Sequence, residues 1–249
     1  MQSKLLVVAI DGPANSGKGT IASGVTELLN EGICSQGSVA ITSIKRFVHL
    51  DTGVLYRSLA YLLIKQRGSV KEIDSSIERA ALALIAQGEI LRTVEWLSSI
   101  SDVEQRVLIR TSEVSEVSSK IAVIPGVRTG LLDLQRHFVA NLTKDLAVAI
   151  LDGRDIGSVV FPNAVCKIYV TASVDVRAKR YQSANKIVSF DQALKEITER
   201  DERDKNRSIA PLICGDDYVT LDSTRLSREQ SIAKAQEIIL ESLSLNGVV

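Results

Sequence analysis

The sequence is poor in residues that cross-link a chain or chelate a metal. Only three of its 249 residues are cysteine, at Cys34, Cys166 and Cys214, and they form no Cys-x-x-Cys pair. An odd number of widely spaced thiols excludes a disulfide framework and argues against a zinc site. This cysteine usage is typical of a reducing compartment, so we expect a cytoplasmic protein.

Histidine is almost as scarce as cysteine. The chain has two, His49 and His137, and neither adjoins a candidate nucleophile or shows the spacing of metal ligands. Both are interpreted as structural residues. We therefore expect no chemistry that depends on an imidazole.

The chain also lacks an excess of charge of either sign and any long apolar run. Thirty basic and thirty acidic side chains give a formal net charge of zero, which does not favour nucleic acid or a membrane surface as a partner. No stretch approaches the roughly 18 apolar residues that cross a bilayer, and the first apolar run stops at Asp11, too early for a signal peptide. We expect a soluble monomer with no nucleic-acid or membrane partner.

What the sequence does have is a regular alternation of apolar runs and helical patterns. Hydrophobic residues make up 45% of the chain, enough for a sizeable core. Strands that are apolar throughout and that alternate with helices predict an α/β fold, with a central parallel sheet covered by helices on both faces. The predicted strands are Leu5–Ile10, Val39–Thr42, Phe47–Leu50, Leu146–Leu151, Cys166–Val170 and Tyr218–Leu221.

Helical patterns fill most of the remaining sequence. They are predicted at Gly19–Asn30, Thr52–Gln66, Ser75–Gln87, Ser112–Ile121, Val127–Asn141, Asp175–Ser183, Phe190–Asp204 and Arg228–Leu243. Residues 30–38 are interpreted as a loop. Two regions interrupt the alternation: residues 65–110, with a mixed stretch through Trp96 and Asp102, and the highly charged residues 182–215, which have the composition of a mobile flap.

A phosphate-binding loop follows the first predicted strand. Its residues are Gly12, Pro13, Ala14, Asn15, Ser16, Gly17, Lys18, Gly19 and Thr20. Glycines allow backbone N–H groups to surround a polyphosphate, the next helix directs its positive end to the same place, and Lys18 can reach the β- and γ-phosphates. The sequence therefore predicts binding of a nucleoside triphosphate.

The position of the hydroxyl group in this loop bears on magnesium. A Ser or Thr that binds Mg²⁺ usually follows the lysine directly, but here Gly19 intervenes before Thr20. We expect Thr20 to lie nearer the α-phosphate, and Mg²⁺ to be held by phosphates and water without a direct protein ligand. Such an arrangement suits a small-molecule kinase.

Three further clusters place charge at strand ends or helix starts. In the first, Asp51 or Thr52 can cap a helix that carries Arg57 in its first turns; an ordinary cap and a solvated arginine explain this segment equally well. In the second, Asp152 ends a presumed central strand, from which it can reach the magnesium shell through water. Arg154 and Asp155 follow it between two glycines.

The third cluster lies in the charged region. Arg200, Arg203, Asp204 and Arg207 have helical spacing, so we expect one helix face with three guanidinium groups and a carboxylate. A solvated helix with ion pairs is the alternative. A phosphate-binding loop elsewhere in the chain favours function, because phosphoryl transfer requires several cations.

Together these segments resemble the bacterial-type cytidylate (CMP/dCMP) kinases, a nucleoside monophosphate kinase family of the P-loop kinases. The resemblance covers nearly the whole chain. It rests on segments 10–20, 50–57, 111–119, 125–128, 152–162, 200–207 and 210–212, in this order. It implies one domain, with a core of about 1–64, 111–181 and 216–249, a monophosphate-binding insert of about 65–110 and a lid of about 182–215.

The resemblance also implies an activity and a site. The reaction is transfer of the γ-phosphoryl group of ATP to CMP or dCMP, with Mg²⁺, in pyrimidine nucleotide metabolism. The catalytic residues are Lys18, Arg154, Arg207 and Asp152, and residues Gly12 to Thr20 hold ATP. The implied CMP-binding residues are Asp51, Thr52, Tyr56, Arg57, Ser119, Arg128, Arg154, Asp155, Arg200, Asp204 and Arg207.

Specific roles follow from the same family pattern. Arg57, Arg154 and Arg207 bind the phosphates, and Arg200 and Asp204 hold the sugar hydroxyls. Ser119, Arg128 and Asp155 read the cytosine base, with Asp155 accepting from its exocyclic amino group. Two alternatives are a kinase for UMP, AMP or shikimate, and a nucleotide-binding switch; the Asn-Lys-x-Asp that reads guanine is missing from the sequence.

Overall fold

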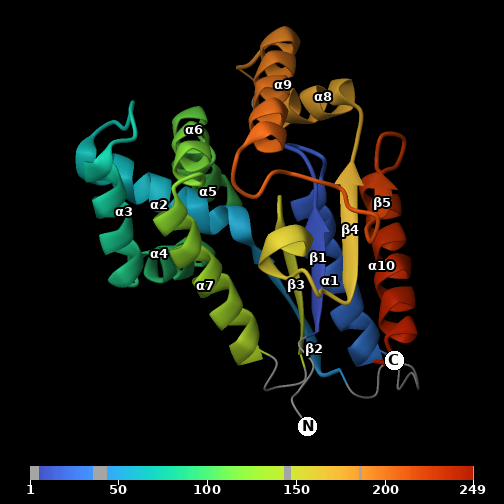
Figure 1. Ribbon diagram of the computed structural model, residues 1–249. Coiled ribbons are helices and arrows are strands. Elements are labelled where there is room, and N and C mark those ends of the chain that lie inside the picture. The colour runs from blue at the N-terminus through green and yellow to red at the C-terminus, as the bar shows by residue number, and fades with distance from the viewer. Residues whose placement is uncertain (1–5, 36–43, 143–146, 185–186, 249) are drawn as a thin grey trace. The chain divides into compact units, whose positions relative to one another are not determined.

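The computed structural model describes residues 6–35, 44–142, 147–184 and 187–248. These residues form two compact units (Figure 1): unit 1 comprises residues 1–50 and 138–249, and unit 2 residues 51–137. The insert and lid boundaries implied by the family resemblance remain predictions.

Unit 1 is built on a five-stranded sheet. In the order β2-β3-β1-β4-β5, its strands are β2 (Arg46–Asp51), β3 (Ala147–Gly153), β1 (Val7–Asp11), β4 (Cys166–Thr171) and β5 (Val219–Asp222). The pairs β1–β3, β1–β4 and β4–β5 are parallel, with Asp11 opposite Gly153 and Tyr169. The predicted α/β fold with a parallel central sheet is confirmed. The predicted strand Val39–Thr42 lies outside the described residues.

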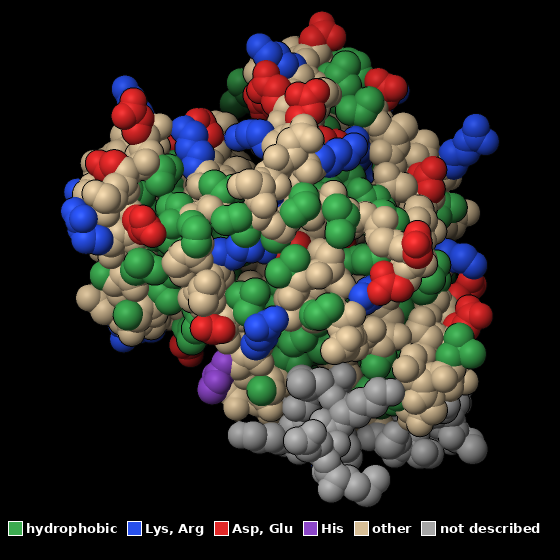
Figure 2. All heavy atoms as spheres, in the orientation of Figure 1, with side chains coloured by type: hydrophobic (Ala, Val, Ile, Leu, Met, Phe, Trp, Pro, Cys, Tyr) green, Lys and Arg blue, Asp and Glu red, His purple; other side chains and the backbone are tan. Residues whose placement is uncertain are grey.

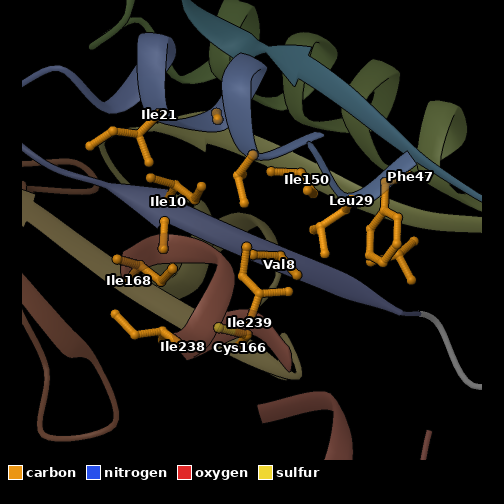
Figure 3. Packing of buried hydrophobic residues seen from close by; sticks show 14 of the residues in the cluster. Val8, Ile10, Ile21, Leu29, Phe47, Ile150, Cys166, Ile168, Ile238 and Ile239 are labelled. Carbon is orange, nitrogen blue, oxygen red and sulfur yellow. The ribbon is translucent and has the colours of Figure 1, made fainter. Parts of the chain in front are cut away.

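Two long helices pack on the same side of this sheet. They are α1 (Lys18–Ser35) and α10 (Arg228–Leu245), and they bury apolar side chains against β1, β3 and β4. Figure 3 shows Val8, Ile10 and Ile168 of the sheet close to Ile21 of α1 and Ile239 of α10. Because Val8 and Ile10 of β1 are buried in this core, the loop after β1 starts from a fixed strand.

Helix α1 is longer than the sequence pattern predicted. It continues to Ser35, so the prediction of a loop from residue 30 onward is wrong for residues 31–35. The physical reason is that Ile33 continues the spacing of Val25 and Leu29 and packs against the same core. Apolar burial therefore extends the helix past the predicted end.

Two helices of unit 1 follow β4 in the chain. They are α8 (Val174–Ala184) and α9 (Phe190–Asn206), which pack together through Ala178, Ala193 and Ile197. In Figure 1 they stand beyond the arrowhead of β4. A short π-helical turn, η2 (Ile156–Val160), follows β3. These elements therefore lie at the carboxyl ends of the strands, where open parallel sheets bind ligands.

Unit 2 is helical. It contains α2 (Thr52–Arg67), α3 (Ser75–Ala86), α4 (Glu89–Ser98), α5 (Asp102–Ile109), α6 (Ser112–Ile121) and most of α7 (Pro125–Leu142), around a second apolar cluster. The mixed stretch predicted through Trp96 and Asp102 is wrong, because these residues belong to α4 and α5. Ile90 and Leu97 explain α4, since they bury one helix face seven residues apart.

The surface carries charge of both signs. Figure 2 shows basic and acidic side chains interspersed over the face in view, in keeping with the equal numbers of the two kinds in the sequence. None of the helices in the described ranges is both long enough and apolar enough to span a membrane.

Candidate active site

The predicted phosphate-binding loop connects β1 to α1. It needs glycine at its first position, because a Cβ atom on Gly12 would lie 2.1 Å from the carbonyl oxygen of Val170 on β4. Asn15 and Gly17 adopt left-handed backbone angles, with φ of 56° and 94°, which glycine and asparagine tolerate best. The loop therefore turns sharply against β4 and delivers Lys18 to the first turn of α1.

Lys18 lies at the start of α1, and the dipole and N–H groups at a helix N-terminus favour an anion. Its ammonium group is held close to the loop, since Nζ donates to the carbonyl oxygen of Pro13 at 3.3 Å. The side chain is largely buried. A buried ammonium at a helix N-terminus can neutralise phosphate oxygens strongly, because little water screens it.

Two arginines of α8, neither of them predicted as a site residue, donate hydrogen bonds to the loop. Arg177 Nη1 donates to the carbonyl oxygen of Ala14 at 3.2 Å, and Arg180 Nη1 donates to that of Ser16 at 3.0 Å. Ser223, which follows β5, donates to the same Ser16 oxygen at 3.1 Å and accepts from Arg180. These bonds fix two peptide groups of the loop. No local pattern indicates them.

The predicted residue Asp152 lies at the end of β3 and is buried. Its Oδ1 is 2.7 Å from Nε2 of His49 on β2, and a Cβ atom placed on Gly19 would lie 3.5 Å from its Oδ2. The end of β3 therefore meets the first turn of α1. His49, interpreted from the sequence as structural, contacts a predicted catalytic residue.

Arg154 forms an ion pair with Asp204 of α9. Arg154 Nε donates to Asp204 Oδ2 at 2.8 Å, and Arg154 Nη1 donates to the Gly153 carbonyl at 3.3 Å. Burial favours the neutral form of Asp204, but the positive charges of Arg154, Arg200 and Arg207 outweigh it and lower the pKa of this carboxyl. Burial also opposes the charge of Arg154, yet Asp204 raises the net pKa of the guanidinium. Both groups stay ionised.

Arg207 pairs with Asp155, at 3.5 Å between Nη2 and Oδ1. Its Nε donates to the carbonyl oxygen of Ala210, a residue with a left-handed φ of 49°. The prediction that three arginines and Asp204 share one helix face is wrong. Helix α9 ends at Asn206, so Arg207 lies beyond it with an extended backbone. Arg203 is exposed and donates to a carbonyl oxygen of its own helix. The turn at Ala210, rather than helical spacing, directs Arg207 to Asp155.

A buried carboxylate links this region to β1. Asp11 accepts hydrogen bonds from the backbone N–H groups of Ile156 and Gly157, at 2.9 and 2.8 Å, and from the Tyr218 hydroxyl at 2.8 Å. Burial raises the pKa of Asp11, and the three donors only partly offset this effect. Asp11 thus holds the chain that follows Arg154 and Asp155. Asp11 is not among the residues predicted for the site.

Unit 2 holds the other predicted CMP-binding residues. Asp51 precedes α2, but its side chain makes no capping hydrogen bond, so the capping prediction is wrong for Asp51. Its carboxylate instead accepts a hydrogen bond from Arg57 Nη2 at 3.0 Å. Arg110 approaches the same carboxylate at 3.9 Å. Thr52 is buried and Tyr56 half-buried in the first turns of α2.

The two remaining residues of unit 2 lie on α6 and α7. Ser119 donates to the Ser115 carbonyl at 3.0 Å, and Arg128 is buried with Nη1 3.5 Å from the Ala122 carbonyl oxygen. Within unit 1, two direct pairs of predicted residues follow β3, Arg154 with Asp204 and Asp155 with Arg207. Within unit 2, direct contact joins Asp51 to Arg57.

The chain is similar to known proteins along nearly its whole length. The family model described as Cytidylate kinase matches residues 8–241. A Cytidylate kinase from Pasteurella multocida is 41% identical over 254 residues, covering 98% of this chain and 99% of that protein. One from Rhodospirillum rubrum is 37% identical, covering 94% and 97%, and one from Klebsiella pneumoniae is 36% identical, covering 98% and 100%. Because the family model and these relatives cover nearly its whole length, the chain belongs to the cytidylate kinase family.

Proposed function

We propose that the protein transfers the γ-phosphoryl group of ATP to CMP or dCMP, giving ADP and CDP or dCDP, in pyrimidine nucleotide metabolism. The observation that carries the proposal is a contact in unit 1 between the end of β3 and the start of α1. There Asp152 lies beside Gly19 of the proposed phosphate-binding loop. Family membership supports the same activity. We further propose that it acts in the cytoplasm as a monomer.

In this proposal residues Gly12 to Thr20 hold the triphosphate of ATP. The first turn of α1 and Lys18 supply positive charge to the β- and γ-phosphates. The residues present also fit Mg²⁺, because Asp152 offers a buried carboxylate whose Oδ2 faces Gly19. Asp152 would hold the ion through water. The ion would neutralise phosphate charge when bound.

The acceptor phosphate is assigned to arginines. Arg154 uses Nε and Nη1 for Asp204 and Gly153, and a guanidinium has five N–H donors, so it can bind Asp204 and a phosphate together. Arg207 and, in unit 2, Arg57 are assigned the same task. Their charge is permanent, and their planar geometry matches phosphate oxygens.

The nucleoside of CMP is assigned to the remaining residues. Asp155 would accept from the exocyclic amino group of cytosine, with Arg128 and Ser119 completing the contacts to the base. Arg200 and Asp204 would hold the sugar. Asp51, Thr52 and Tyr56 of unit 2 are assigned to CMP by their match to the family motif. Uracil has a carbonyl where cytosine has the amino group, so Asp155 would reject it.

The chemistry proposed is a direct in-line transfer. The acceptor oxygen of CMP is already anionic, so no strong general base is required. Catalysis then consists of holding the two phosphates in line and neutralising the charge of the transferring group with Lys18, Arg154 and Arg207. The positive charges of these side chains can act without a proton transfer.

The proposal is tested by ADP release measured with CMP, dCMP, UMP, AMP and shikimate as acceptors. We expect efficient release with CMP and dCMP only. Lys18→Ala should lower this turnover by roughly 10² or more, the scale for one preorganised donor. Lys45→Ala, at an exposed lysine of the same unit, should have no effect. ADP release without any acceptor, or a preference for another acceptor, would contradict the proposal.

A further inference from the structure

His49 and Asp152 form a contact that the proposed function does not use. They lie on β2 and β3, which are neighbours in the sheet, and are 103 residues apart in the chain. Nε2 of His49 is 2.7 Å from Oδ1 of Asp152, and the two side chains are 20% and 5% exposed. A short hydrogen bond of this kind, largely screened from water, restrains both side chains.

The second oxygen of Asp152 faces a different neighbour. Its Oδ2 would be 3.5 Å from a Cβ atom on Gly19, in the first turn of α1. The carboxylate therefore spans from the imidazole of His49 to the start of the phosphate-binding helix.

A carboxylate does not hold such an orientation unaided. The last torsion of an aspartate has a broad energy profile, so its two oxygens can exchange or tilt away. A donor on Oδ1 limits this rotation and thereby decides where Oδ2 lies. Residues that orient a charged group in this way affect metal affinity and activity without touching the ligand.

We propose that His49 is a positioning residue for phosphoryl transfer: it holds Asp152 so that Oδ2 faces the start of α1. There Oδ2 would bind water of the magnesium ion that accompanies ATP. The proposal rests on the proposed function, in which Asp152 contributes to that shell. His49 itself would touch neither nucleotide.

The test compares three substitutions at His49. His49→Phe keeps a ring but removes the donor, His49→Gln places an amide nitrogen at about the reach of Nε2, and His49→Asn places it one carbon short. We expect His49→Phe and His49→Asn to lower kcat about 10-fold, with the KM for CMP changed less than about twofold, and His49→Gln to recover most of the loss. If His49 only filled space, His49→Phe would leave kcat unchanged.

A binding measurement separates this proposal from the proposed function. The affinity for a non-hydrolysable ATP analogue is measured by calorimetry with and without Mg²⁺. We expect His49→Phe to reduce the gain in affinity from Mg²⁺ about 10-fold, while the metal-free affinity stays near that of the parent protein. If CMP does not act as an acceptor but His49→Phe still reduces the gain in affinity from Mg²⁺, the proposed function fails and the role of His49 in positioning Asp152 stands.

A double substitution completes the design. Asp152→Ala and His49→Phe/Asp152→Ala should show the same kcat and the same gain from Mg²⁺, because His49 acts only through Asp152. Thermal unfolding shows whether each variant is folded. If His49→Phe does not fold, His49→Asn replaces it in these measurements. The proposal would be overturned if His49→Phe and His49→Asn both kept the full gain in affinity from Mg²⁺. It would also be overturned if the losses of the two single substitutions added up in the double variant.

Discussion

Asp204 of α9 accepts a hydrogen bond from Arg154 Nε at 2.8 Å and thereby ties α9 to the end of β3. The two side chains are 10% and 17% exposed. Because a carboxylate holds Arg154, its guanidinium would already be oriented for the phosphate that the proposed function assigns to it. The pair therefore contributes to both the stability of unit 1 and the geometry of the proposed site.

Asp204→Asn should destabilise the fold, most strongly near neutral pH. The folded pKa of Asp204 is below its ordinary value of about 3.9, so its stabilising effect is complete above that value and is lost as the pH falls through the folded pKa. We expect a loss of about 3 kcal/mol in the free energy of unfolding at pH 7, and a smaller loss below about pH 4. Denaturant unfolding between pH 3 and pH 7 measures this.

Glu202→Gln is the matched control, because Glu202 is an exposed carboxylate of the same helix. We expect its unfolding free energy to follow that of the parent at every pH. A loss in Asp204→Asn that does not depend on pH would contradict the role of the Arg154 pair.

Arg180→Met should weaken ATP binding. The substitution leaves the Ser16 carbonyl without one of its two side-chain donors and removes both bonds to Ser223. A lost donor to a buried acceptor costs about 1–3 kcal/mol, so we expect the KM for ATP to rise between about 5-fold and 100-fold. Lys179→Met removes the same charge from an exposed position of α8. If both substitutions raised the KM for ATP equally, the cause would be the lost positive charge and not the lost hydrogen bond to the loop.

Gly12→Ala should damage both stability and ATP binding. Its Cβ atom would lie 2.1 Å from the backbone oxygen of Val170, and a backbone atom in a central strand cannot rotate away. Overpacking of this kind costs about 1–3 kcal/mol. Gly32→Ala is the control, because nothing lies within 4 Å of that position on α1, and alanine should leave the stability unchanged or raise it by about 0.5–1 kcal/mol. Thermal unfolding of both variants tests the contrast.

Asp155→Ala should reduce the preference for CMP over UMP, because the proposed acceptor for the amino group of cytosine is gone. The variant also removes the partner of Arg207, so its turnover should fall with both acceptors. Arg207→Met separates the two effects: it should lower turnover with both acceptors and leave their ratio unchanged. The ratio of kcat/KM for CMP and UMP is measured, and an unchanged ratio in Asp155→Ala would refute its role as a base reader.

The sequence predicted much of the fold because its signals are local. The apolar run ending at Asp11, the glycines at 12 and 17 and the helix after Lys18 are consecutive, and the structure has them as β1, the loop and α1. Element ends were predicted less well, as at Ser35 and within α4, because burial against distant residues extends helices. The roles of the predicted site residues with ATP and CMP stay predictions.

The order of residues along the chain determined by itself the phosphate-binding loop, the alternation of strands and helices, and which segments carry the arginines. Only the tertiary structure decided the partner of each charge: His49 for Asp152, Asp204 for Arg154, and Arg180 for a loop carbonyl 164 residues away. The physical reason is that helix and strand formation depends on side chains a few positions apart, whereas a buried ion pair depends on which strand ends the sheet brings together.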